Sequence, residues 1–97
     1  LYGDGSIVLI RSPGHTCGHQ SILVRTSAGA SVLLAVDAAD TMDHFEEKAL
    51  PGALHSAIEV VRSVKKLRAV QQREGALVIA GHDTEQWAEL RKAPDFY

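Results

Sequence analysis

The stretch "QSILVRTSAGASVLLAVD", residues 20–37, is the part of this sequence that predicts most about its fold. Two apolar segments rich in β-branched residues, 20–26 and 31–36, flank "SAGA" (27–30), whose small residues and glycine indicate a turn. The second segment is apolar at nearly every position, which is typical of a strand buried on both faces. We therefore expect a β-hairpin that ends at Asp37.

Two more strands are predicted outside this hairpin. The segment "SIVLI" (6–10) is rich in strand-forming residues and follows "GDG", a strong turn signal. The segment "ALVIA" (76–80) is a short apolar run of the kind found in buried strands. Between the hairpin and this last strand, residues 37–54 show no clear period and predict a long loop with room for one short helix.

Two helices are predicted in the second half of the chain. Residues 56–73 carry apolar side chains at helical spacing, with Ser56 as the N-cap and Gly75 as the stop. A second helix is expected over 84–92. The order β-β-β-α-β-α predicts an α/β fold in which helices cover a sheet. Four apolar strands with so few helices leave part of the sheet uncovered, so we expect a portion of a larger fold.

Composition excludes several functional classes. The chain has 97 residues, 45% of them hydrophobic and 23% charged, with a formal net charge of -2. This balance predicts no nucleic-acid partner and no binding to an anionic membrane. Neither a membrane-spanning run nor a signal peptide is recognisable. Cys17 is the only cysteine, which excludes an internal disulfide and favours a cytoplasmic location.

Three polar residues follow predicted strands: His15, Asp37 and His82. Imidazole nitrogen and carboxylate oxygen together suit zinc or another first-row divalent ion. We expect the three side chains to converge at one end of the sheet. The alternative is that both histidines are held in loops by hydrogen bonds, since no closely spaced histidine pair lies on a predicted helix.

Three stretches, "SPGHTCGHQSILVRT", "LLAVDAADT" and "AGHDTEQWAELRKAPDFY", resemble the N-acyl homoserine lactonase branch of the metallo-β-lactamase superfamily. The resemblance covers essentially the whole chain, although the first two stretches would also suit a glyoxalase-II-like thioesterase. It implies that residues 1–97 form the C-terminal half of an αββα sandwich, the C-terminal portion of a hydrolase domain. The family's H-x-H-x-D-H motif, which supplies the other metal ligands, is absent and belongs to the N-terminal half.

The resemblance also implies roles for individual residues. His15 corresponds to a ligand of one metal ion, Asp37 to a carboxylate that bridges two ions, and His82 to a ligand of the second. In this family, a hydroxide held between two divalent ions, here expected to be Zn²⁺, opens the lactone ring of N-acyl homoserine lactones, which is quorum quenching. Asp37 and Asp40 are the expected catalytic residues, and the 97-residue chain alone is expected to be inactive.

Two positions depart from the family pattern. Asp40 stands where lactonases usually carry a tyrosine, and an ionised carboxylate cannot donate the hydrogen bond of that hydroxyl. His44 is a substitute donor to consider. Cys17 replaces a usual proline and is either a small buried residue or a thiol near the metal and sensitive to oxidation. His19 is assigned to loop structure.

Alternatives of other classes stay open at this point. The chain could be a non-catalytic fragment or an interaction module that folds only against another chain, or an enzyme for a thioester or another lactone. The expected partners are a small-molecule lactone or related ester and the missing N-terminal half. The sequence leaves a homodimer open and predicts neither nucleic acid nor membrane as a partner.

Overall fold

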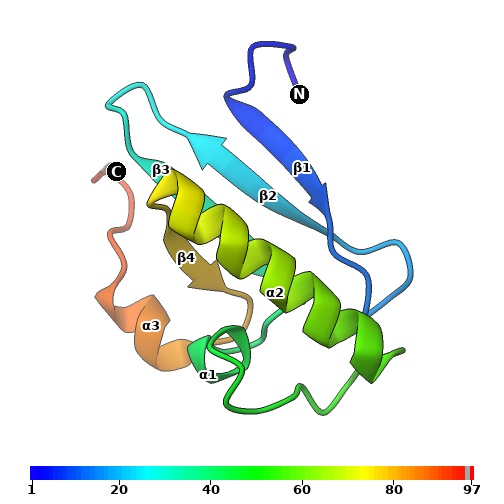
Figure 1. Cartoon of the computed structure of the whole chain (residues 1–97). Coiled ribbons are helices and arrows are strands. Elements are labelled where there is room, and N and C mark those ends of the chain that lie inside the picture. The colour runs from blue at the N-terminus through cyan, green and yellow to red at the C-terminus, as the bar shows by residue number, and fades with distance from the viewer. Residues whose placement is uncertain (96) are drawn as a thin grey trace.

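The computed structural model describes residues 1–95 and residue 97. One mixed sheet runs in the order β1-β2-β3-β4, antiparallel between the first three strands and parallel between β3 and β4 (Figure 1). The α/β class predicted from the sequence is confirmed. The elements are β1 (Ile7–Arg11), β2 (Gln20–Arg25), β3 (Ser31–Val36), α1 (Met42–Phe45), α2 (Ala57–Glu74), β4 (Leu77–Ala80) and α3 (Thr84–Glu89).

The predicted bounds hold to within one residue except in the last helix, where the prediction was wrong. This helix ends at Glu89 and not at residue 92 because Leu90 adopts an extended backbone with ψ of 145°. The Nζ atom of Lys92 donates to the carbonyl groups of Trp87 and Leu90 at 2.6 and 3.1 Å. The lysine thereby satisfies carbonyl groups at the end of the helix that have no intrahelical partner.

Helix α2 is defined at both ends by its capping residues. The Ser56 hydroxyl accepts a hydrogen bond from the N–H of Glu59 at 3.3 Å, as expected for the N-cap predicted at this position. Gly75 closes the helix in the left-handed conformation at φ 60°, and its N–H donates to the carbonyl of Gln71. In the part of the chain that the structure describes, no helix combines the length and hydropathy needed to cross a bilayer.

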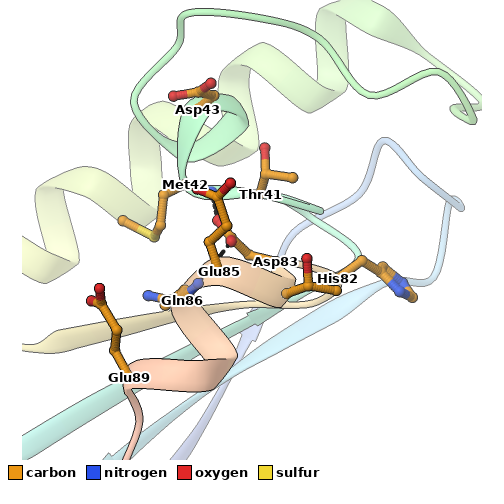
Figure 2. Close-up of a pocket in the computed structure, with 9 residues that line it drawn as sticks. Thr41, Met42, Asp43, His82, Asp83, Glu85, Gln86 and Glu89 are labelled. Carbon is orange, nitrogen blue, oxygen red and sulfur yellow. Dashed lines mark hydrogen bonds between the residues drawn. The ribbon is translucent and has the colours of Figure 1, made fainter.

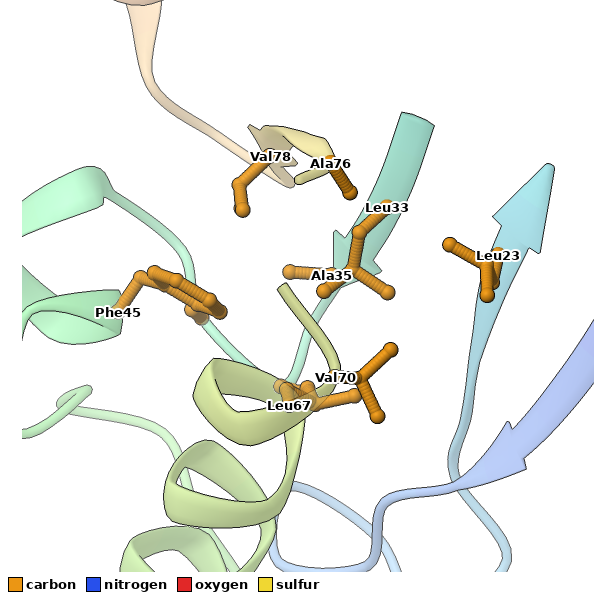
Figure 3. Close-up of a cluster of buried hydrophobic side chains, with 10 residues drawn as sticks. Leu23, Leu33, Ala35, Phe45, Leu67, Val70, Ala76 and Val78 are labelled. Atoms are coloured by element: carbon orange, nitrogen blue, oxygen red, sulfur yellow. The ribbon is translucent and has the colours of Figure 1, made fainter. Parts of the chain in front are cut away.

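The hydrophobic core lies between α2 and one face of the sheet (Figure 3). Leu33 of β3 and Leu67 of α2 are fully buried there, and burying each side chain contributes roughly 1.5–3 kcal/mol to stability. The core consists of Leu23, Leu33, Ala35, Ala38, Ala39, Phe45, Leu67, Val70, Ala76 and Val78.

The opposite face of the sheet is also apolar. Successive side chains of a strand point to opposite faces, so the residues that alternate with the core residues form this second surface. Leu9 at one edge is 44% exposed and Leu77 in the strand at the other edge is 38% exposed. The prediction of a partly uncovered sheet is therefore consistent with the structure. This apolar sheet face consists of Ile7, Leu9, Ile22, Val24, Val32, Leu34, Leu77 and Ile79.

Candidate metal centre

The side chain of Asp37 lies between the two histidines that the sequence singled out. Its Oδ1 atom is 2.9 Å from Nε2 of His82, and its Oδ2 atom is 3.9 Å from Nε2 of His15. All three residues follow strands and meet at the same end of the sheet, so the predicted convergence is found in the structure. Their role as metal ligands stays a prediction at this point.

Asp37 is positioned by a strained residue at the end of β3. Val36 has φ of 53°, in the left-handed region, which β-branched residues rarely adopt. The register of the β3–β4 ladder shifts between Leu34 and Val36, and this irregularity re-aims the chain just before the carboxylate. Backbone strain of this kind persists only where surrounding contacts hold it, and it is concentrated at functional sites.

His82 is brought to Asp37 by a close backbone approach at Gly81. A Cβ atom at Gly81 would lie 2.6 Å from the carbonyl oxygen of Val36, so only glycine lets β4 end this close to β3. Two hydrogen bonds then fix the segment, from Gly81 N to Ala39 O at 3.0 Å and from His82 N to Asp40 O at 2.7 Å. The loops that follow β3 and β4 thus form one joined unit.

The loop that carries His15 is docked onto the start of α2. Gly14 has φ of 145°, and a Cβ atom there would lie 2.7 Å or less from three atoms of Val60. The carbonyl of Gly14 accepts hydrogen bonds from the N–H groups of His55 and Ser56 at 2.7 and 3.0 Å. Glycine is therefore required at position 14 for this contact, and the contact sets the position of His15.

A hydrogen bond also fixes the orientation of the His15 ring. Its Nδ1 atom lies 3.0 Å from the carbonyl oxygen of Ala53, which can only accept, so Nδ1 carries the proton. The lone pair of Nε2 then faces Asp37. This arrangement, with one ring nitrogen bonded to a carbonyl and the other free to ligate, is common among metal-binding histidines. His15 can therefore be both a hydrogen-bonded loop residue and a metal ligand, so the two interpretations do not exclude each other.

Asp40 also lies in this cluster. Ligand atoms of Asp37, Asp40 and His82 all lie within 4.8 Å of one another. The Nδ1 atom of His44 is 3.9 Å from Oδ2 of Asp40, and in the described part of the chain this buried nitrogen has no hydrogen-bond partner. Clustered carboxylate oxygens and imidazole nitrogens are the ligands of first-row divalent ions, so these residues fit such an ion.

His19 belongs to the support behind the site. Its Nδ1 atom lies 2.9 Å from the hydroxyl of Ser12, which in turn contacts the hydroxyl of Ser21 at 2.8 Å. Ser21 donates to the carbonyl of Ala35 at 3.0 Å, so the network links β2 and β3 to the loop that follows β1. Cys17 is exposed in the same loop, so the prediction of a small buried residue was wrong there.

Asp83 is a structural residue that the sequence reasoning missed. Its carboxylate caps α3 by accepting from Gln86 N at 3.0 Å and also accepts from Met42 N at 2.9 Å, so it joins the starts of α1 and α3. These backbone N–H donors lower the pKa of the Asp83 carboxyl below its usual value. An aspartate directly before a helical segment is an N-cap signal that could have identified it.

Gln86 was missed as well, and its side chain contacts the backbone of the strand six to eight residues before it. Its side-chain Oε1 atom accepts from Ala80 N at 2.9 Å, and its Nε2 atom donates to Val78 O at 2.6 Å. The amide therefore satisfies the outer backbone groups of β4 as a neighbouring strand would. This bond pair fixes the strand that ends at His82.

A cavity of about 600 Å³ opens beside the cluster, between α1 and α3 (Figure 2). Carboxylates dominate its wall, and Figure 2 shows the imidazole of His82 at one end, directed away from Glu85 and Glu89. His82 belongs both to this lining and to the cluster, whereas Asp37 and Asp40 do not line the cavity. Its lining residues are Thr41, Met42, Asp43, His82, Asp83, Thr84, Glu85, Gln86 and Glu89.

Comparison with known proteins identifies close relatives, although no family model matches the chain. The chain is 54% identical over 97 residues to the N-acyl homoserine lactonase AttM of Rhizobium johnstonii and covers 37% of that protein. It is 36% identical over 100 residues to the N-acyl homoserine lactonase AiiA of Bacillus thuringiensis subsp. kurstaki, covering 40% of it. The chain thus spans well under half the length of these relatives.

Solved structures agree with the sequence comparison. An N-acyl homoserine lactone hydrolase with N-hexanoyl-L-homoserine bound at its catalytic metal centre matches with a TM-score of 0.89 at 33% identity. The match covers 100% of this chain and 38% of the hydrolase, as expected for a portion of the domain. Over its whole length, the chain is therefore homologous to one part of the N-acyl homoserine lactonases, and its fold is a part of their metallo-β-lactamase fold.

Proposed function

We propose that this chain is the C-terminal portion of a metal-dependent hydrolase that opens the lactone ring of N-acyl homoserine lactones. The observation that carries the proposal is the convergence of His15 and His82 on the two oxygens of Asp37. The 54% identity to a lactonase over the whole chain supports the same conclusion. A thioesterase function has less support than a lactonase function, because the relatives and the solved structures that resemble this chain are named as N-acyl homoserine lactonases or hydrolases.

In the proposed enzyme, His15, Asp37 and His82 hold two divalent ions, with zinc as the first choice for this set of ligands. When bound, such ions polarise a carbonyl group and make a bound water more acidic. Asp37 presents a different oxygen to each histidine, which suits a carboxylate shared between two sites. The hydrogen bond to Ala53 already orients the ring of His15, so the side chain would lose little further freedom when it binds a metal ion.

The N-terminal half of the domain would complete both the fold and the metal site. The apolar sheet face, with Leu9 and Leu77 well exposed, would pack against the N-terminal half, since large apolar patches mark interaction surfaces. That half would also supply the remaining metal ligands. We place residues 1–97 in a single hydrolase domain and the protein in the cytoplasm, where the exposed thiol of Cys17 would stay reduced. A homodimer stays a prediction.

The test measures hydrolysis of N-hexanoyl homoserine lactone by the full-length protein that contains this segment. We expect activity that chelation abolishes and Zn²⁺ restores, and that His15→Ala removes together with bound metal. The isolated chain should show no activity, because two histidines and one carboxylate fall short of the usual ligands for two ions. A full-length protein that binds metal but hydrolyses only glutathione thioesters would favour the thioesterase, and one that binds no metal would favour a non-catalytic module.

A further inference from the structure

The position of Asp40 is the feature that the proposed function does not use. The turn after β3 returns the chain so that Asp40 faces Asp37, and the backbone hydrogen bond from His82 N to Asp40 O joins the two loops at 2.7 Å. Ligand atoms of these three residues lie within 4.8 Å of one another. Two carboxylates this close repel each other unless a cation lies between them.

We propose that Asp40 is a metal ligand, which adds a second carboxylate to the site formed by Asp37 and His82. This inference rests on the proposed metal centre but not on its substrate. The carboxylate is about three-quarters buried, and the hydrogen bond that the Asp40 carbonyl accepts from His82 N fixes the main chain that carries it, so an ion could bind without a rearrangement of the loop. A tyrosine hydroxyl at this position would serve a different purpose, since it donates hydrogen bonds and is a poor ligand when protonated.

His44 supports this role from the other side. Its Nδ1 atom is buried, lacks a hydrogen-bond partner among the described residues, and lies 3.9 Å from Oδ2 of Asp40. A small movement would let this nitrogen donate to one carboxylate oxygen while the other binds the ion. Ligating carboxylates are commonly oriented by such partners, whose loss weakens metal binding about 10- to 100-fold.

A carboxylate ligand from Asp40 would change which metal ion the site prefers. It adds a hard oxygen ligand and one negative charge on the side of His82, and the His15 side gains neither. Carboxylate-rich sites favour Mn²⁺ relative to sites made mainly of imidazole. We therefore expect the two metal positions to differ in affinity, with the position at Asp40 more tolerant of Mn²⁺.

The test compares two variants of the full-length protein that each remove one negative charge, one in the loop after β3 and one three residues later in α1. In Asp40→Asn the carboxylate of the cluster is lost, whereas in Asp43→Asn an exposed carboxylate that pairs with Lys48 is lost. Metal content after dialysis against graded chelator gives the affinity of each position, and the Co²⁺ absorption spectrum reports the ligands. Asp40→Glu should restore part of what Asp40→Asn loses.

We expect Asp40→Asn to weaken one of the two metal positions at least about 10-fold and to alter the Co²⁺ spectrum, with Asp43→Asn unchanged. Equal affinities and spectra in the unaltered protein and Asp40→Asn would overturn the proposal, as would equal losses in both variants. If Asp40→Asn does not fold, a crystal structure of the metal-loaded protein decides, with an Asp40 oxygen about 2.0–2.2 Å from the ion expected. A protein that binds metal through Asp40 but hydrolyses no lactone would refute only the proposed function.

Discussion

The Nε2 atom of His82 lies 2.9 Å from Oδ1 of Asp37, although 45 positions separate the two residues in the chain. The other carboxylate oxygen faces His15 at 3.9 Å. One side chain at the end of β3 therefore connects two loops that bring histidines from opposite ends of the chain. The contribution of each part of this arrangement can be measured separately.

Asp37→Asn should damage the full-length enzyme more than any other single change in this segment. The amide keeps the size of the side chain but replaces one of the two histidine-facing oxygens with an N–H₂ group, which cannot ligate a cation, and it removes the negative charge. We expect metal content to fall at both positions and kcat/KM to drop by more than about 100-fold. Elemental analysis and lactone hydrolysis provide the measurement.

The control for Asp37→Asn is Asp40→Ala, which should affect one metal position and leave more activity. A variant Asp37→Asn that keeps both metals and most of its kcat/KM would show that the carboxylate is not shared between them.

Gly14→Ala should destabilise the protein and displace His15. The added Cβ would lie 2.5 to 2.7 Å from atoms of Val60, including its backbone nitrogen, and φ of 145° is unfavourable for alanine. Overpacking of this kind costs about 1–3 kcal/mol in the free energy of unfolding. Gly18→Ala in the same loop is the matched control, because nothing lies within 4 Å of its Cβ position. Urea unfolding measures both variants, and equal midpoints would refute the close contact.

Gln86→Glu should weaken the strand that ends at His82. The substitution keeps an acceptor for Ala80 N but replaces the donor to Val78 O with a second acceptor, so two oxygens face each other. We expect a loss of about 1–3 kcal/mol, the cost of an unsatisfied partly buried group. Thermal unfolding tests this, with Gln72→Glu on the exposed side of α2 as a control that changes stability by less than about 0.5 kcal/mol.

The ion pair between Arg25 and Glu74 should make stability depend on pH. The guanidinium donates to both carboxylate oxygens, at 3.1 and 2.6 Å, and lowers the pKa of Glu74 below its usual value of 4.5. Because the pKa of Glu74 is lower in the folded state, the ion pair stabilises the protein fully above about pH 4.5. This contribution is lost as the pH falls through the pKa that Glu74 has in the folded protein.

Glu74→Gln should therefore unfold more easily than the unaltered protein near neutral pH, and the difference should disappear on acidification. Urea unfolding at a series of pH values measures it. A difference that stays constant across the acidic range would mean that Glu74 stabilises the fold by packing and not by its charge.

Local sequence patterns determined the elements of this protein. The apolar segments around "SAGA" specified the β2–β3 hairpin, and the caps at Ser56 and Gly75 specified α2, because each depends on a few neighbouring residues. The same reasoning placed His15, Asp37 and His82 after strands. Strands that share a sheet bring such residues together at one end, so their proximity followed from the element order.

Which other side chains reach the site, and how they are held, follows from contacts between distant segments of the folded chain. The sequence alone could not place Asp40 next to His82 or pair the His15 ring with Ala53, because these contacts join segments far apart in the chain. Nor could it show that Gln86 pairs with β4. Such contacts depend on the path of loops, and loop paths are set by close packing and hydrogen bonds between segments, which leave no periodic trace in the sequence.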